Sequence, residues 1–233
     1  MTSPGSLPRY LQISELLARD IAAGRLIDGE RLPPERAMAG ELGIAVGTLR
    51  QALAELTERG LLERVQGSGN YVRARADPTS VYAMFRLELT EGGGLPTARI
   101  LSVDRLPKDR RLPPFGTSAD GHRIRRLRLV SGRLAAVEEI WLDASFAPTL
   151  TREALSESLY LHYRQRFGLW IVRAEDRIGQ GALPDWAPAE FPHRPGAILP
   201  EITRIGWSQN GESAEASFTW YDPGTVRYVA RLK

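Results

Sequence analysis

The chain has 233 residues, which allows one large domain or two modest ones, each able to bury a core. Hydrophobic residues make up 42% and charged residues 25%, as in globular proteins. The absence of cysteine excludes disulfides, thiolate catalysis and cysteine-ligated metal sites. The three histidines include no pair at the spacing of helical metal ligands, so we expect no metal site, no catalytic residues and no cofactor.

Basic residues number 31 against 28 acidic, and all but two of the basic residues are arginine. The net charge of +3 does not by itself indicate a nucleic-acid partner, although arginine suits bidentate recognition of phosphate, carboxylate and guanine. Lys108 and Lys233 are poor candidates for a Schiff base, which excludes a pyridoxal-phosphate enzyme. No stretch has the apolar length of a membrane span or a signal peptide, so we expect a cytoplasmic protein without a membrane partner.

Three helices are predicted in the first 60 residues. Apolar residues recur every three or four positions over 8–24, between a proline and a glycine, which indicates an amphipathic helix. A second, short helix is predicted over 34–43, where Pro34 suits the first turn. A third helix is predicted over 48–60, with Thr48 as its N-terminal cap and a leucine-rich buried stripe.

Two short β-type runs, 61–65 and 70–74, follow the third helix and are joined by a turn that contains two glycines. Three helices and a hairpin are typical of a winged helix-turn-helix, in which the third helix enters the major groove and the hairpin approaches the DNA backbone. The predicted third helix leaves Thr48, Arg50 and Gln51 facing outward. Periodicity alone leaves DNA binding and protein binding open, because domains of both kinds share this layout.

Five fragments occur in a fixed order between residues 8 and 72: Y-x-x-I, G-x-x-L-P-x-E-R, T-x-R-x-A-L-x-x-L, G-L and G-x-G-x-x-V. In this order and spacing the segment resembles the GntR family of bacterial transcription regulators. The resemblance implies that Arg36, Thr48 and Arg50 contact DNA, with Gln51 on the same exposed side of the helix. It also implies that the hairpin tip lies close to the duplex, through Gly67, Ser68 and Gly69.

The chemistry of these side chains agrees with a DNA surface. Arg50 can donate two hydrogen bonds to O6 and N7 of guanine, whereas Arg36 and the serine and threonine hydroxyls suit phosphates. Two alternatives stay open: Arg36 can pair with Glu41 on the helix surface, and Ser68 can be only a turn residue. Residues 45–47 read Ala-Val-Gly where the family usually has Ser-Arg, so the sequence does not predict the operator.

Residues 77–82 predict a short linker, which divides the chain into a DNA-binding domain over 1–76 and a second domain over 83–233. The second domain is predicted to be mixed α and β, so the whole chain belongs to the α+β class. Its predicted strands span 97–106, 122–132, 135–143, 169–179, 198–207, 215–222 and 227–233, with a helix near 156–167.

Arg126 and Arg128 are two residues apart on a predicted strand, so both side chains point to the same face. Three interpretations are open from the residues alone. The two arginines can be solvated surface charges, they can pair with internal carboxylates, or they can bind an anion.

A second set of motifs covers residues 83–233: R-x-R-L and a turn, V-E ten positions after Arg128, then S-L-Y, and E-x-S-x-x-x-Y near the C-terminus. The set resembles the UTRA ligand-sensing domain of the HutC branch of GntR regulators, which shares the fold of chorismate lyase. The resemblance implies that Arg126 and Arg128 clamp the anionic group of a small effector. It implies that Glu138, Glu215 and Tyr221 take the hydroxyl or amino groups of that effector.

Two departures from the UTRA pattern indicate that the effector has diverged. Residues 84–86 read Met-Phe-Arg, where many relatives carry Ser-Phe-Thr with hydroxyl donors for the anion. Arg86 either replaces those hydroxyls as an anion ligand or points into solvent. The stretch 221–228 also departs from the family's Y-R-G-D-R-Y, so the sequence does not identify the effector.

The leading hypothesis is a DNA-binding transcription regulator, by family behaviour a repressor, whose operator affinity changes when a small anionic metabolite binds the second domain. An enzyme that uses a chorismate-lyase-like domain is the alternative from another class, and a DNA-binding protein without an effector is a third. The missing metal ligands and nucleophile set speak against the enzyme. We expect a nucleoid-associated homodimer on a palindromic operator, because one short recognition helix reads only a few base pairs.

Overall fold

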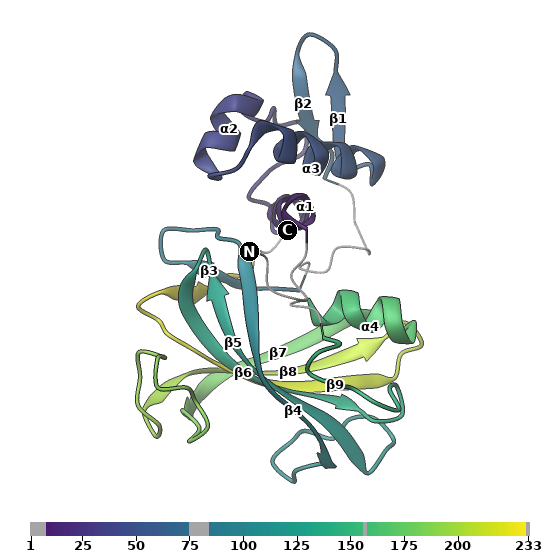
Figure 1. The fold of residues 1–233 in the computed structure, drawn as a ribbon, viewed down its shortest axis with the longest axis vertical. Helices are drawn as coiled ribbons and strands as arrows, with labels where there is room; N and C mark the ends of the chain where they lie inside the picture. Colours follow the sequence, from purple (N-terminus) through teal and green to yellow (C-terminus); the bar gives the residue numbers. More distant parts are fainter. Residues whose placement is uncertain (1–7, 75–83, 156–157, 232–233) are drawn as a thin grey trace. The chain divides into compact units, whose positions relative to one another are not determined.

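The computed structural model describes residues 8–74, 84–155 and 158–231 (Figure 1). The described residues divide into two compact units, one that holds 8–74 with short flanking segments and one that spans 87–227. The linker predicted over 77–82 lies outside the described residues. The first unit is mainly helical and the second is mainly sheet, which confirms the predicted α+β class.

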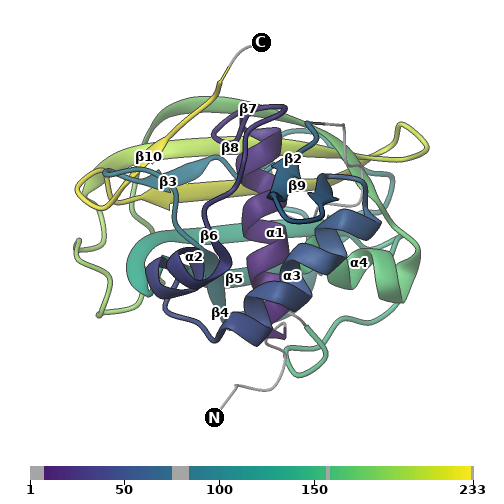
Figure 2. The same ribbon diagram turned by 90° about the horizontal axis from the view of Figure 1, so that it is seen from above.

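The first unit contains three helices, α1 (Arg9–Ala22), α2 (Glu35–Glu41) and α3 (Val46–Glu58). Their apolar stripes pack into one core, in which Ile13, Ile21, Leu49 and Leu56 are almost completely buried. Figure 2 shows α3 crossing α1. Each helix ends just before a glycine with positive φ, a conformation that residues with a Cβ avoid. The predicted order of three helices is therefore confirmed.

The start of α3 differs from the prediction. The helix begins at Val46 rather than at Thr48, because the Ala45 carbonyl already accepts a hydrogen bond from the Leu49 N–H at 3.1 Å. Ala45 occupies the N-cap position with extended backbone, and no side chain caps the helix. Thr48 therefore lies inside the first turn, and its predicted capping role is wrong.

An antiparallel hairpin follows α3 and consists of β1 (Leu62–Val65) and β2 (Gly69–Val72). Val65 stands opposite Gly69, so three residues form the turn, and Gly67 within it has φ +75°. Arg31, in the loop between α1 and α2, forms a further β-bridge with Tyr71. The three helices and the hairpin make up the predicted winged helix-turn-helix.

The second unit is built on a six-stranded antiparallel sheet in the order β4-β5-β6-β9-β8-β7. Its strands are β4 (Pro96–Pro107), β5 (Asp120–Val130), β6 (Arg133–Asp143), β7 (Ile171–Ala182), β8 (Ile198–Ser208) and β9 (Ser213–Tyr221). The strands β4 and β7 are the two edges of this sheet.

The last predicted strand, 227–233, is wrong in its extent. The strand β10 covers only Val226–Tyr228 and pairs with the short strand β3 (Leu87–Leu89) in a separate two-stranded sheet. Val229 then donates its N–H to the carbonyl of Arg86, and residues 229–231 form no strand. The extended conformation ends there because β3 offers only three residues for pairing.

The helix α4 (Leu159–Phe167) covers one face of the six-stranded sheet (Figure 1). Leu159 and Tyr163 of α4 pack against Ile124, Ile140 and Leu142 of the sheet. The opposite face is covered by the β4–β5 connection, which contributes Leu112 and Phe115, and by the β7–β8 connection over 183–197. All five tryptophans of the chain belong to this second unit, at positions 141, 170, 186, 207 and 220.

Candidate DNA-binding face and effector site

The predicted DNA-contacting residues of α2 and α3 lie on the surface of the first unit. Arg36, Arg50 and Gln51 are exposed, and Thr48 is half-buried. The alternative in which Arg36 pairs with Glu41 does not hold, since Arg36 makes no ion pair with any residue that the structure describes. Arg50 instead donates its Nε–H to Glu35 Oε2, at a distance of 2.6 Å.

The hairpin tip carries the other predicted DNA contacts. Gly67 is exposed, whereas Ser68 and Gly69 are half-buried. The Ser68 hydroxyl exchanges a hydrogen bond with the Tyr71 hydroxyl at 2.7 Å, which leaves the pair one further donor proton and spare lone pairs. A Cβ added at Gly69 would lie 3.3 Å from Nε of Arg31, so the Arg31 guanidinium lies against the hairpin.

Sequence reasoning did not assign Arg31. The exposed Arg31 side chain adds positive charge beside the hairpin tip, and its position follows from the β-bridge that its backbone makes with Tyr71. The sequence gives only a basic residue in a loop there, because a single β-bridge between distant segments leaves no periodic pattern.

Five of the six predicted effector residues share one face of the sheet in the second unit. Arg126 stands opposite Glu138 in the β5–β6 register, and Arg128 is two residues from Arg126 on β5. On β9, Glu215 stands opposite Leu142 of β6, and Tyr221 stands opposite Ala136. Because side chains alternate along a strand, these registers place all five side chains on the face that α4 covers.

Arg126 and Arg128 both bind the same carboxylate. Arg126 donates its Nε–H to Glu138, and Nη2 of Arg128 lies 3.2 Å from Glu138 Oε2. The three residues are 7%, 4% and 6% exposed, so the interpretation of solvated surface charges is wrong. The structure shows the second interpretation, a pair with an internal carboxylate. Two guanidinium groups therefore share this carboxylate.

The triad also sets the ionisation of Glu138. Burial by itself would raise the pKa of the Glu138 carboxyl, but the attraction and hydrogen bonds of Arg126 and Arg128 outweigh burial and hold this pKa below its ordinary value. Glu138 is therefore ionised at neutral pH.

Glu215 lies in a different environment on the same face. Its Oε1 accepts a hydrogen bond from the Tyr160 hydroxyl of α4 at 3.1 Å. Its Oε2 and the hydroxyl of Tyr163 are both buried and form no hydrogen bond of ordinary geometry within the described part of the chain, although Tyr163 interacts with Glu215 and helps to lower the Glu215 pKa. Burial raises the pKa of Glu215 above its ordinary value, and the charge of Arg126 opposes this shift only in part.

The network on this face includes residues that sequence reasoning missed. Arg204 of β8 forms a two-fold hydrogen-bonded ion pair with Asp176 of β7, at 2.6 and 2.7 Å. The Tyr160 pKa is raised by burial and by the charge of Glu215, and the charge of Arg204 opposes that rise. The S-L-Y motif pointed to Tyr160, but nothing in the local pattern separates Arg204 from the chain's other arginines.

Two predicted effector residues stand apart from the triad. Tyr221 is 8% exposed, and its hydroxyl makes no hydrogen bond with the described residues. Arg86 is half-buried, and its Nη1 lies 3.4 Å from the neighbouring carbonyl of Phe85.

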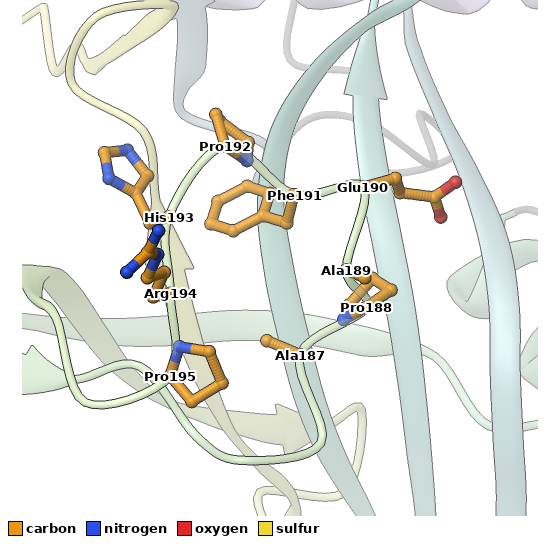
Figure 3. Close-up of a pocket in the computed structure, with 9 residues that line it drawn as sticks. All are labelled: Ala187, Pro188, Ala189, Glu190, Phe191, Pro192, His193, Arg194 and Pro195. Carbon is orange, nitrogen blue, oxygen red and sulfur yellow. The ribbon is translucent and has the colours of Figure 1, made fainter.

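A separate pocket lies within the β7–β8 connection (Figure 3). It has a volume of about 490 Å³ and is lined by residues 187–195, none of which is a predicted effector residue. Phe191 of this loop packs with Leu127 and Trp220, on the sheet face opposite Arg126. The pocket is therefore distinct from the triad and its neighbours.

The described residues contain no group of three or more histidine, aspartate or glutamate side chains arranged for a metal ion. Among these residues, no helix combines the length and the apolar character needed to cross a lipid bilayer.

Comparison with protein families assigns both units. Residues 9–72 match the family model described as bacterial regulatory proteins, gntR family, and residues 91–227 match the UTRA domain. The chain belongs to the GntR family of bacterial regulatory proteins. It combines a DNA-binding winged helix-turn-helix with a UTRA ligand-binding domain, so this GntR protein is a transcription regulator and not an enzyme.

Individual relatives agree with this assignment. The chain is 62% identical over 229 residues to the HTH-type transcriptional regulator SmoD of Agrobacterium fabrum, across 98% of both chains. It is 30% identical over 179 residues to the mannosyl-D-glycerate transport/metabolism system repressor MngR of Escherichia coli, across 75% of both. The crystal structure of the possible transcriptional regulator YydK from Bacillus subtilis shares the fold, with a TM-score of 0.54 and 20% identity, covering 97% of this chain and 100% of that one.

Glu138 and Glu215 are expected to affect stability in opposite directions. Replacing Glu138 by Gln leaves two buried guanidinium groups without their carboxylate, so we expect a loss of about 3–5 kcal/mol in the unfolding free energy at neutral pH. Glu138 has a lowered folded pKa, so its contribution to stability is present above the unfolded pKa and is lost as the pH falls through the folded pKa.

The pKa of Glu215 is raised in the folded state, so ionisation of this carboxyl destabilises the fold. The destabilisation is absent at low pH and develops as the pH rises from the pKa of the unfolded state through the pKa of the folded state. The variant Glu215→Gln keeps an acceptor for Tyr160 but cannot ionise. We expect the melting temperature of this variant, measured by tryptophan fluorescence, to exceed that of the wild type at pH 8 and to equal it at pH 4. Destabilisation by both variants at pH 8 would contradict this assignment of charges.

Proposed function

We propose that this regulator recognises its operator through α3 and the hairpin tip. The observation that carries the proposal is the exposed side of α3, where Arg50 and Gln51 stand free of the leucine core. An exposed helix of this size fits the major groove, and guanidinium and amide groups read the edges of guanine and adenine. Arg36 and Thr48 then contact phosphates.

The hairpin residues complete the proposed DNA surface. Gly67, Ser68 and Gly69 let the hairpin tip approach the backbone closely, and the adjacent Arg31 adds a phosphate contact. We propose repression as the mode of regulation, because the relative MngR is named as a repressor.

The second proposal is a small anionic metabolite, rich in hydroxyl groups, as the effector of the UTRA domain. The guanidinium groups of Arg126 and Arg128, held together by Glu138, are of the kind that binds carboxylate or phosphate groups. The buried Glu215 Oε2 and Tyr163 hydroxyl, with the Tyr221 hydroxyl, suit ligand hydroxyls on the same face. A sugar acid or sugar phosphate combines both features, and the name of MngR refers to a sugar linked to glycerate. Arg86 is proposed as a further anion ligand.

The third proposal is a homodimer held by the edge strand β7. Its outer edge pairs with no other described strand, although the strand has twelve residues. Val172 and Ile178 on β7 are 50% and 54% exposed, and Trp170 and Ile198 next to its ends are exposed as well. A long apolar edge is prone to association, and pairing two copies antiparallel about a two-fold axis satisfies both edges.

The charges of β7 suit pairing with a second copy. Glu175 and Arg177 are both exposed and lie two residues apart on one face. About a two-fold axis at Asp176, Glu175 of each copy stands opposite Arg177 of the other. Such a dimer presents two recognition helices to a two-fold symmetric operator.

The roles of Arg50 and Arg36 predict different binding defects. We expect Arg50→Ala to cost about 1–3 kcal/mol on the operator and to remove the preference for one guanine. We expect Arg36→Ala to weaken binding to operator and random DNA alike and to reduce the salt slope by about 1. Fluorescence anisotropy titrations at several salt concentrations measure both effects. Equal losses on operator and random DNA for Arg50→Ala would refute its role in base recognition.

An anionic sugar effector predicts thermal stabilisation by ligand. We expect at least one member of a panel of sugar acids and sugar phosphates to raise the melting temperature and to change operator affinity. Tyr221→Phe removes one hydroxyl without a described partner, so it should weaken that ligand about 2- to 12-fold and leave the ligand-free melting temperature unchanged. The absence of any shift across the panel would sink the proposed ligand class.

The β7 interface predicts a change in oligomeric state. We expect Ile178→Lys to place two like charges in the interface and to give a monomer in sedimentation velocity at micromolar concentration, where the wild type sediments as a dimer. The matched control is Ile27→Lys, because Ile27 is 62% exposed and belongs to the first unit. A dimer that survives Ile178→Lys would place the interface elsewhere, and a monomeric wild type would refute the homodimer itself.

A further inference from the structure

The proposed DNA surface leaves one charged residue of the P-E-R triplet, Glu35, without a role. Glu35 is the first residue of α2, directly before Arg36, and it points to α3 rather than to its own helix. Its carboxylate accepts the Nε–H of Arg50 at 2.6 Å, across 15 residues of sequence. Glu35 is therefore the one described partner of the arginine proposed to read a base.

The contact between Glu35 and Arg50 is too exposed to contribute much to folding, which leaves a role in function. The Arg50 side chain is 66% exposed and that of Glu35 is 25% exposed. Ion pairs between such exposed groups are screened by solvent, so the contact adds little to stability. Its geometric effect is larger, since it fixes the plane of a side chain that otherwise samples many rotamers.

The atom that Glu35 binds determines which atoms remain for DNA. With Nε donating to Glu35, both Nη groups of Arg50 remain without a hydrogen bond among the described residues. These two groups form the end of the guanidinium fork, and their spacing matches O6 and N7 of guanine. Glu35 thus holds the fork side-on and leaves its end for the base.

We propose that Glu35 is a positioning residue for base recognition, which preorganises Arg50 for a guanine and keeps it from neighbouring phosphates. This inference rests on the proposed role of Arg50. The carboxylate offsets the charge of Arg50 and so weakens attraction to the backbone of any DNA sequence. It leaves hydrogen bonding to the correct base intact, so Glu35 increases the difference between operator and random DNA.

The neighbouring arginine shows the contrast. Arg36 follows Glu35 in the chain, is exposed, and makes no ion pair with the described residues. An unrestrained guanidinium suits a phosphate, whose contact needs charge more than orientation. The triplet therefore supplies one mobile cation for the backbone and one anion that orients the base-reading arginine.

The test uses the full-length protein and a duplex selected from a randomised oligonucleotide library by the wild type. Single-base-pair variants of this duplex first locate the guanine whose preference Arg50→Ala removes. We expect Glu35→Gln to reduce the preference at that same base pair about 2- to 12-fold, the effect of losing preorganisation of one long side chain. Preferences at other base pairs should remain, and affinity for random DNA should stay equal or increase.

The matched control is Glu41→Gln, which removes one exposed carboxylate from the same helix without touching Arg50. The double variant Glu35→Gln, Arg50→Ala should lose no more preference than Arg50→Ala alone, because Glu35 acts through Arg50. Melting temperatures should agree within a few degrees across the set, which separates positioning from a fold defect.

The outcomes distinguish the proposed role of Arg50 from the proposed role of Glu35. If Arg50→Ala changes no base preference, the proposed role of Arg50 fails, and the positioning role fails with it. If Arg50→Ala abolishes one preference while Glu35→Gln behaves as Glu41→Gln, the role of Arg50 stands and the inference about Glu35 is overturned.

Discussion

The burial of Glu138 between Arg126 and Arg128 is the constraint on which the second unit depends. Three charged groups lie buried on the central strands β5 and β6, and each would be costly there alone. The β5–β6 register places Glu138 opposite Arg126, so a slip by one residue would separate the charges and move them to opposite faces. The ion pairs therefore favour this register of the two central strands.

The first unit follows a simpler rule. Its helices bury apolar stripes against one another, and the charged groups proposed to contact DNA lie at the surface. Such a surface can change residue by residue without disturbing the core. The face of the second unit that α4 covers has no such freedom, because its arginines and carboxylates are part of the packing.

Sequence periodicity predicted the helices, the hairpin and six of the seven strands proposed for the second domain, since each carries a local pattern. The alternation of a strand placed Arg126 and Arg128 on one face, but it could not show that both pair with Glu138. That pairing depends on strand register, as does the place of Glu215 opposite Leu142. The contacts of Glu35 with Arg50 and of Arg204 with Asp176 join distant elements and leave no local signal. The early start of α3 shows that backbone geometry can replace an expected cap.

The distribution of chromophores gives the two units separate optical signals. The five tryptophans all belong to the second unit, whereas α1, α2 and α3 have 14, 7 and 13 residues against 9 in α4. Intrinsic fluorescence therefore reports on the ligand-binding unit, and far-ultraviolet circular dichroism at helical wavelengths reports mainly on the DNA-binding unit. In one unlabelled sample, the two signals can reveal whether a ligand stabilises its own unit alone or both units together.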